Sequence, residues 1–182
     1  MSDEHLLELA LGGDGSCFGE LVRRWEQKIY GFIRRYVGNS EEAKDLTQDT
    51  FTKAFQNLDR LSDPSRFSSW LYKIALNECR MLFRRQKGTF NVPLDEGGRE
   101  LARVDRNEAA QEKGLQIKES VVQLRRAFTK LPKEQREVIL MKEFQGLKFI
   151  EISEILDVPL STAKSRMYLG LKMLKRIMEE ES

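Results

Sequence analysis

Helical periodicity constrains this chain more than any other feature. Apolar residues recur at steps of three and four, which places them on one face of an α-helix. Such stripes run over residues 18–36, 43–58 and 67–82, and again from residue 121 onward. Strand signals are essentially absent, and Leu, Glu, Lys, Arg and Gln, which favour helices, are all plentiful. The sequence therefore predicts an all-α protein.

Turn-forming residues divide the first half into helices. Gly38 ends the first stripe, and Asn39 with Glu42 three residues later is typical of a capped helix start. Asp63 and Pro64 mark a second turn, because proline suits the first position of a helix. With a short segment over residues 6–11, these helices can bury a compact core over residues 1–87.

The middle of the chain has a different character. Periodicity fades over residues 88–118, which contain Pro93, the pair Gly97-Gly98 and charges of both signs. We interpret this stretch as a flexible linker, with a short helix near residues 103–113. Because 182 residues suffice for two small domains, the expected organisation is a helical domain over 1–87, the linker over 88–118 and a second helical domain over 119–182.

Residues 148–177 have the layout of a helix-turn-helix. A short first helix is followed by a turn that contains Pro159 and by a longer second helix. Small Ala163 suits a close crossing of two helices. The residues that we expect these two helices to bury are Ile150, Ile152, Ile155 and Leu156, then Ala163, Met167, Leu171 and Leu174.

The opposite face of the second helix is polar and basic. No acidic residue occurs between Val158 and Ile177. In a helix-turn-helix the second helix lies in the DNA major groove, where hydroxyls and long basic side chains bind phosphates and base edges. An ordinary helical hairpin with a solvated basic face would show the same pattern, so the pattern alone leaves both interpretations open.

Several function classes find no support in the sequence. Cys17, Cys79 and His5 lack metal-ligand spacing, so we expect no metal and no cofactor. The GGDG run at 12–15 lacks the lysine of a phosphate loop, and no nucleophile motif accompanies the single histidine, so neither an enzyme nor a small-molecule substrate is expected. An acidic N-terminus and the absence of a long apolar run predict a cytoplasmic protein with two buried, reduced cysteines.

Two separate regions resemble the bacterial sigma factors. Residues 132–176 are similar to their C-terminal promoter-binding domain, most specifically in the stretch EISEILDVPLSTAKSR. In the first half, GDGSCFGELVRRW resembles the opening helix, AKDLTQDTFTKAF the polymerase-docking helix and FSSWLYKIALNECRMLFRRQK the minus-10 segment. Only the second and fourth of the conserved sigma domains have counterparts in this sequence. This domain content resembles that of the extracytoplasmic-function (ECF) subgroup of the sigma-70 family.

The resemblance implies a function and a set of partners. Such a protein binds core RNA polymerase and directs promoter-specific transcription initiation by recognising minus-35 and minus-10 elements and assisting DNA melting. The expected partners are the beta-prime clamp helices and the beta subunit of polymerase, promoter DNA, and an anti-sigma factor of the kind that commonly restrains this subgroup in stress responses. The linker must span roughly 60 Å between promoter elements at ~3.4 Å per base pair, which about thirty residues can do when extended.

The resemblance also assigns roles to residues. Asn77 matches the family asparagine near a base flipped out of the stack, and the loop over residues 57–65 is expected to line the base pocket. Trp70 could stack on DNA, but its place in the apolar stripe favours a role in the core. The polymerase-binding residues would be Asp45, Gln48, Asp49, Phe51 and Thr52. The minus-10 residues, expected on one broadly shared exposed side, would be Lys73, Asn77, Arg80, Arg84 and Arg85. The minus-35 residues would be Ser161, Thr162, Lys164, Ser165, Arg166, Tyr168 and Lys172.

The sequence has three other interpretations. A free-standing helix-turn-helix regulator would explain residues 120–178 but would leave the first half without a role, and such regulators usually dimerise on palindromic sites. An adaptor that binds only protein would leave the basic faces unused. An enzyme lacks any supporting motif. Binding of promoter DNA by the pure protein alone, against binding only with core polymerase, separates the first of these from a sigma factor.

Overall fold

The structure is a computed structural model, and it describes residues 1–86 and 122–180. The predicted linker at 88–118 lies outside the described residues. Within them every regular element is helical, as predicted, and no strand occurs. The elements are α1 (Asp3–Leu11), α2 (Gly15–Val37), α3 (Ser40–Gln56), η1 (Leu58–Arg60), η2 (Pro64–Arg66), α4 (Phe67–Arg85), a helical stretch over 122–129, α6 (Lys133–Ile139), the π-helical turn η4 (Leu140–Phe144), α7 (Phe149–Leu156) and α8 (Leu160–Glu180).

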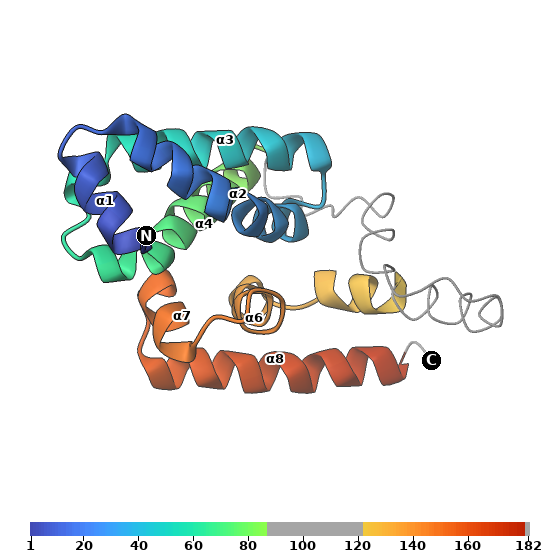
Figure 1. Cartoon of the computed structure of the whole chain (residues 1–182). Helices are drawn as coiled ribbons and strands as arrows, with labels where there is room; N and C mark the ends of the chain where they lie inside the picture. Colours follow the sequence, from blue (N-terminus) through green and yellow to red (C-terminus); the bar gives the residue numbers. More distant parts are fainter. Residues whose placement is uncertain (87–121, 181–182) are drawn as a thin grey trace, which may run out of the picture.

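The N-terminal half, residues 1–86, is a bundle built around α2. This long helix packs against α1, α3 and α4, and α3 packs in turn against α4 (Figure 1). The three predicted stripes meet in its core, where Leu21, Ile29, Phe32 and Leu71 are fully buried. Aromatic rings meet edge-on there, with the Phe32 and Tyr72 centroids 5.4 Å apart.

Local capping starts the helices where the sequence predicts. The Oδ1 atom of Asn39 accepts hydrogen bonds from the backbone N–H groups of Glu41 and Glu42, at 2.9 and 3.1 Å. Gly38, just before it, has a φ of 81°, a left-handed conformation that glycine adopts without strain. Pro64 occupies the first position of η2, as predicted.

The C-terminal half, residues 122–180, contains the predicted helix-turn-helix. The helix α8 packs against both α6 and α7, and the turn after α7 passes through Asp157, which adopts a left-handed φ of 52°. Ala163 and Met167 are buried on α8, as predicted. The burial of Leu171 is wrong, because it is 43% exposed, and Gly170 faces α6 in its place. Ile150 is likewise 52% exposed, since the first turn of α7 packs through Phe149 instead.

The two halves pack against each other, which the sequence did not predict. The contact joins α4 to α7 and α2 to η4 (Figure 1). The helix α8 lies on the far side of α6 and α7 from the N-terminal bundle in this view. Tyr72 of α4 donates a hydrogen bond to Oε1 of Gln145 at 3.0 Å, and the Arg35 guanidinium lies 5.4 Å from the Phe144 ring centre. The two halves are therefore held together by specific side-chain contacts.

Both cysteines are free and buried, as predicted. Burial raises the pKa of the Cys79 thiol, and burial with the nearby Asp14 raises the pKa of the Cys17 thiol. Neither thiol is therefore suited to act as a thiolate nucleophile. Within residues 1–86 and 122–180, no helix has the length and apolar character needed to cross a bilayer.

Candidate nucleic-acid interface

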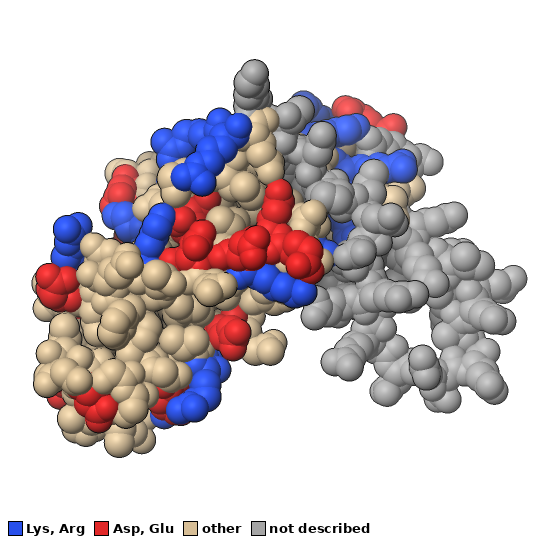
Figure 2. Space-filling view, turned by 90° about the horizontal axis from the view of Figure 1, so that it is seen from above, with Lys and Arg blue, Asp and Glu red and all other residues tan. Residues whose placement is uncertain are grey.

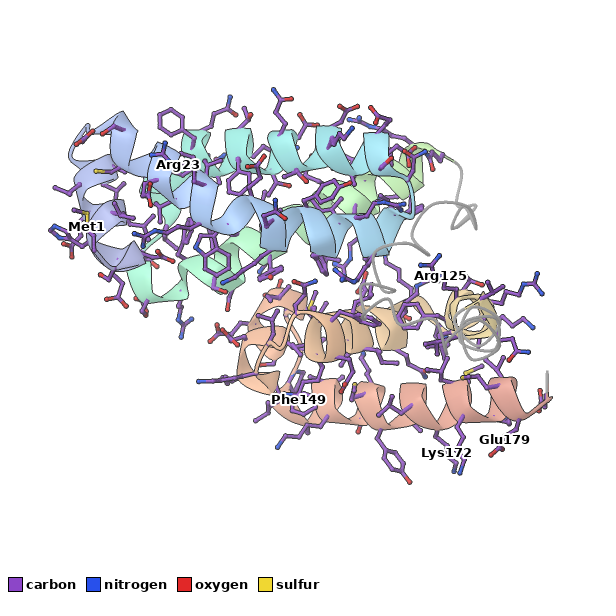
Figure 3. All side chains as sticks on the ribbon, turned by 45° about the vertical axis from the view of Figure 1, so that its right-hand side comes forward. Met1, Arg23, Arg125, Phe149, Lys172 and Glu179 are labelled. Carbon is purple, nitrogen blue, oxygen red and sulfur yellow. The ribbon has the colours of Figure 1, made fainter. Side chains whose placement is uncertain are left out.

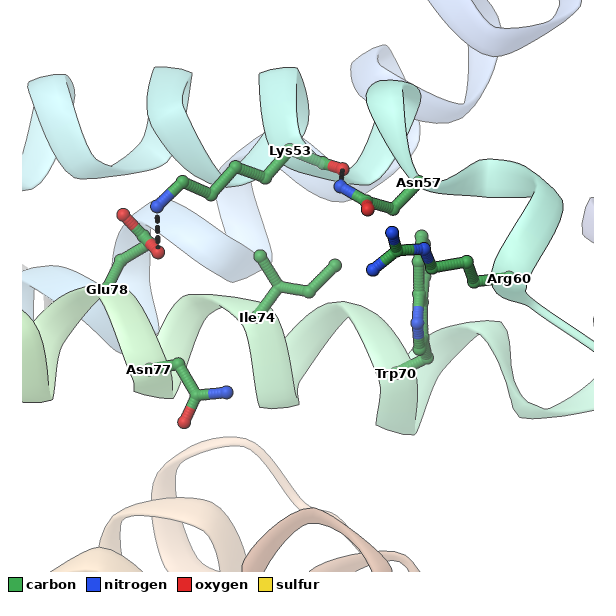
Figure 4. Close-up of a pocket in the computed structure, with 7 residues that line it drawn as sticks. All are labelled: Lys53, Asn57, Arg60, Trp70, Ile74, Asn77 and Glu78. Carbon is green, nitrogen blue, oxygen red and sulfur yellow. Dashed lines mark hydrogen bonds and ion pairs between the residues drawn. The ribbon is translucent and has the colours of Figure 1, made fainter.

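A pocket of about 260 Å³ opens beside α4 in the N-terminal half. Figure 4 shows its lining side chains on α3, the loop after it and α4, with Asn77 pointing to the other side of α4. Two of the lining residues come from the loop over residues 57–65 that the sequence assigned to a base pocket. The lining comprises Lys53, Asn57, Arg60, Trp70, Ile74, Asn77 and Glu78.

The polar groups of this pocket are held in place by one another. The Nζ atom of Lys53 lies 2.6 Å from Oε1 of the buried Glu78, and the Asn57 amide donates to the Lys53 carbonyl oxygen at 2.8 Å (Figure 4). Asn77 is exposed at the rim, and among the described residues its amide has no hydrogen-bonding partner. Such an amide can bond the Watson–Crick edge of an unpaired base.

Trp70 both packs against the core and lines the pocket. Its indole is half-buried and packs against Phe67, with ring centroids 6.1 Å apart, which agrees with the expected core role. The same ring forms a wall of the pocket (Figure 4). A flat aromatic wall next to an amide and a guanidinium offers both stacking and hydrogen bonding to a nucleobase.

The predicted minus-10 cations do not form one exposed surface. Arg84 and Arg85 are exposed at the end of α4. Lys73, by contrast, pairs with Asp157 at 2.7 Å. The prediction of an exposed side is wrong for Arg80, whose side chain is 29% exposed and makes two hydrogen bonds, of 3.0 and 2.7 Å, to the fully buried Glu137. These bonds raise the pKa of Arg80.

The predicted polymerase-docking residues all lie on α3, and all but one of them are exposed. Asp45, Gln48, Asp49 and Thr52 are exposed on one side of the helix. Phe51 is only 7% exposed, so it packs in the core and its assignment to this face is corrected. The reason is helical geometry, since Phe51 shares the inner face of α3 with buried Ala54 and Thr47.

The side of the molecule that carries α3 shows a band of acidic groups bordered by basic ones (Figure 2). Phe55 is 55% exposed on α3, and its ring lies 5.1 Å from that of Phe18. An exposed aromatic ring among acidic and amide side chains offers both apolar and polar contacts to a protein partner.

The predicted minus-35 residues lie along α8. Lys172 points away from the N-terminal half (Figure 3). Thr162 and Arg166 are half-buried, and the others are exposed, with Tyr168 at 69%. The helix thus presents hydroxyl and basic groups on a free side, which suits a groove-binding helix. The exposed members are Ser161, Lys164, Ser165, Tyr168 and Lys172.

Sequence reasoning missed the acidic partners of α4. Glu137 lies within an apolar stripe of the sequence, where a buried carboxylate needs a hydrogen-bonding partner. That position was the one signal in the sequence that could have indicated its pairing with α4. Glu154 and Asp157 lie close to the turn of the helix-turn-helix and look like ordinary surface acids in the sequence. Lys53 and Glu78 were also missed, because their meeting depends on how α3 crosses α4.

Comparison with known proteins adds independent support. The family model described as Sigma-70 region 2 matches residues 21–89, and that described as Sigma-70, region 4 matches residues 122–174. The "ECF RNA polymerase sigma factor SigW" of Bacillus subtilis is 33% identical over 170 residues, covering 90% of both chains. The "ECF RNA polymerase sigma-E factor" of Escherichia coli K12 is 31% identical over 92% of this chain and 90% of the relative.

Solved structures show the same fold. A structure of CnrH in complex with the cytosolic domain of CnrY superposes with a TM-score of 0.72, at 24% identity over 99% of each chain. The sigma factor RpoE in complex with the anti-sigma factor NepR, from Bartonella quintana, gives a TM-score of 0.64 at 21% identity, over 89% of this chain and 96% of the other.

A region 2 half followed by a helix-turn-helix half defines a DNA-binding transcription factor of the sigma-70 type. The chain belongs to the extracytoplasmic-function sigma factors, and its function is that of an RNA polymerase sigma factor. A free-standing regulator is not favoured, because the first half has its own sigma-70 match.

Proposed function

We propose that this sigma factor binds minus-10 DNA through the α4 pocket and minus-35 DNA through α8, while α3 docks on core polymerase. The observation that carries the proposal is the pocket whose lining combines Trp70, Arg60 from the preceding loop and, at the rim, Asn77. In this proposal residues 1–87 form the minus-10 and polymerase-binding domain, residues 119–182 form the minus-35 domain, and residues 88–118 span the distance between them.

The α4 pocket would capture a base from the minus-10 element. A base becomes accessible on its Watson–Crick edge only when it leaves the duplex. Trp70 offers a stacking surface, Asn77 an amide at the rim and Arg60 a donor from the loop. Capture of the unpaired base stabilises the open strand, which is how the protein would assist melting. Arg84 and Arg85, exposed at the end of α4, would bind backbone phosphates.

The helix α8 would recognise the minus-35 element in the major groove. Its N-terminal turn presents Ser161 and Thr162, whose hydroxyls and backbone N–H groups suit a phosphate. Lys164, Ser165 and Arg166 follow on the first turns, where a groove-bound helix meets base edges, and Tyr168 extends this surface. Lys172 lies further along and would contact phosphate.

The exposed side of α3 would hold the protein on polymerase. Asp45, Gln48, Asp49 and Thr52 would contact the beta-prime clamp helices, and the C-terminal half would contact the beta subunit. The chemistry rests with polymerase, so the protein has no catalytic turnover, small-molecule substrate or cofactor of its own. It acts in the cytoplasm, where polymerase and promoter DNA are found.

An anti-sigma factor is the further partner that we propose. CnrH is recorded in complex with CnrY, and RpoE of Bartonella quintana with its anti-sigma factor NepR. A comparable partner here would restrain the protein until a signal releases it.

In vitro transcription tests the proposal. Purified protein is added to core polymerase on a library of genomic fragments, and the transcript starts are mapped. We expect new starts that share minus-35 and minus-10 sequences, together with co-purification of the protein with core polymerase. Unchanged starts, or failure to bind core polymerase, would contradict the proposal.

A further inference from the structure

Three basic residues occur at seven-residue intervals along η2 and α4. These are Arg66, Lys73 and Arg80. Seven residues correspond to nearly two turns of an α-helix, so the three side chains lie along one face. This basic row is adjacent to the α4 pocket and faces the C-terminal half.

Each member of the basic row is paired with a carboxylate from the C-terminal half. Arg66 lies 3.5 Å from Glu154. Lys73 lies 2.7 Å from Asp157. Arg80 lies 2.7 Å from Glu137. All three acids come from a short part of the chain, α6 to the turn after α7.

Glu137 is the anchor of this contact. It is fully buried, and the Tyr36 hydroxyl of α2 donates to its Oε1 atom at 2.7 Å, alongside the two bonds from Arg80. A buried carboxylate is tolerated only when it is fully hydrogen-bonded, and all three of these bonds cross between the halves. The Asp157 side chain is 72% exposed, so its ion pair with Lys73 contributes less.

The carboxylates also reach the neighbourhood of the base pocket. A second pocket of about 160 Å³ shares Arg60 and Trp70 with the first, and Glu154 forms part of its wall together with Arg66 and Lys73. The Glu154 carboxylate thus lies beside two residues that also line the proposed base pocket. The exposed face of α8, by contrast, points away from this contact (Figure 3).

We propose that the free protein is self-inhibited: Glu137, Glu154 and Asp157 occupy the basic row in place of DNA phosphates, and minus-10 DNA binds only after the two halves separate. The inference rests on the proposed role of α4 in minus-10 binding. It makes the acid-bearing surface of the C-terminal half an internal competitor of DNA. Only the fraction of molecules with separated halves is competent, and the apparent affinity falls by that fraction.

The test uses the full chain with Glu137→Gln and Asp157→Asn. Both changes keep the shape of the side chain, and asparagine tolerates the left-handed conformation at position 157. The matched control, Glu134→Gln with Glu143→Gln, removes the same charge from exposed positions of the same half. Dyes placed at Gln27→Cys and Glu179→Cys report separation of the halves by energy transfer, since the native cysteines are buried.

Binding is measured with a single-stranded oligodeoxynucleotide of mixed sequence. If about a tenth of the wild-type molecules are open, the opened variant binds about tenfold more tightly and its energy transfer falls. Adding Lys73→Gln removes that gain, because the released lysine is what binds the strand. The control pair behaves like the wild type, apart from a small charge effect that both pairs share.

The other outcomes are decisive. Unchanged energy transfer, or a gain in affinity no larger than that of the control pair, overturns the proposal. Separation of the halves without a gain in affinity also overturns it, because the contact then masks nothing. Failure of the proposed function is a distinct result: Lys73→Gln would then leave both single-stranded binding by the opened variant and promoter opening with polymerase unaffected.

Discussion

The amide of Asn77 lies at the rim of the α4 pocket, without a hydrogen-bonding partner among the described residues. We predict that Asn77→Ala impairs minus-10 recognition and opening more than attachment to polymerase. Loss of an amide bonded to a flipped base costs about 1–3 kcal/mol of discrimination. Open-complex formation on duplex and pre-melted promoters measures the effect. Gln27→Ala, at an exposed position of α2, is the control. Base preference that stays the same on both templates would exclude direct reading by Asn77.

Gly170 sets how closely α8 approaches α6. A Cβ atom at this position would lie 2.9 Å from Cδ1 of Ile139 and 3.1 Å from Cβ of Gln135. We therefore predict that Gly170→Ala destabilises the fold by about 1–3 kcal/mol through overpacking. Urea unfolding measures this change. Gly19→Ala on α2, where a Cβ meets nothing within 4 Å, is the control and should instead stabilise by about 0.5–1 kcal/mol. Equal effects of the two changes would contradict the packing argument.

At the scale of elements, α3 has an inner and an outer face with separate roles. We predict that Gln48→Ala with Asp49→Ala weakens binding to core polymerase and leaves the melting temperature unchanged, because both side chains are exposed. Affinity is measured by titration of labelled protein with core polymerase. Glu26→Ala with Gln27→Ala, on the exposed side of α2, is the charge-matched control. Lost thermal stability with unaltered affinity per folded molecule would end the docking assignment.

The helix α8 is expected to divide its contacts along its length. Replacing Lys164 or Ser165 should change the preferred minus-35 sequence, because both lie on the first turns, near base edges. Replacing Lys172 should weaken binding to all sequences alike and reduce the salt slope by about one unit. Selection of minus-35 sequences and salt titrations of each variant give the comparison. An equal loss of affinity for all sequences in both the Lys164 and the Lys172 variants would mean that α8 binds the DNA phosphate backbone and does not recognise bases.

At the scale of the whole molecule, the closed arrangement does not fit a promoter. The helix α7 packs on α4, and only residues 157–159 separate it from α8. Three residues span about 10 Å, whereas promoter elements 17–20 base pairs apart lie about 60 Å apart. We predict that binding to core polymerase and promoter separates the halves, and energy transfer between dyes at positions 27 and 179 should then be lost. Retained transfer in an active complex would contradict this expectation.

Much of the fold could be predicted because it depends on local pattern. The stripes on α2, α3 and α4, the cap at Asn39 and the helix-turn-helix with its turn at Pro159 all follow from residue spacing and backbone chemistry. The exposed basic side of α8 was predicted for the same reason. The absence of acidic residues between Val158 and Ile177 can be seen in the sequence without knowing what packs against this helix. The spacing was less reliable at Leu171 and Ile150, where the angle at which α6 and α7 pack decides which side turns inward.

The sequence by itself determined the helices, their order and the sigma-type motifs, because these rest on interactions between residues a few positions apart. Only the tertiary structure decided which α4 cations are exposed. Arg80 and Glu137 lie 57 positions apart, and their pairing depends on how the two halves meet across a long intervening segment. Burial then makes that pairing obligatory, because a carboxylate removed from water must be hydrogen-bonded. No periodicity in the sequence records such a contact, so the competition between acid and DNA on α4 becomes visible only in three dimensions.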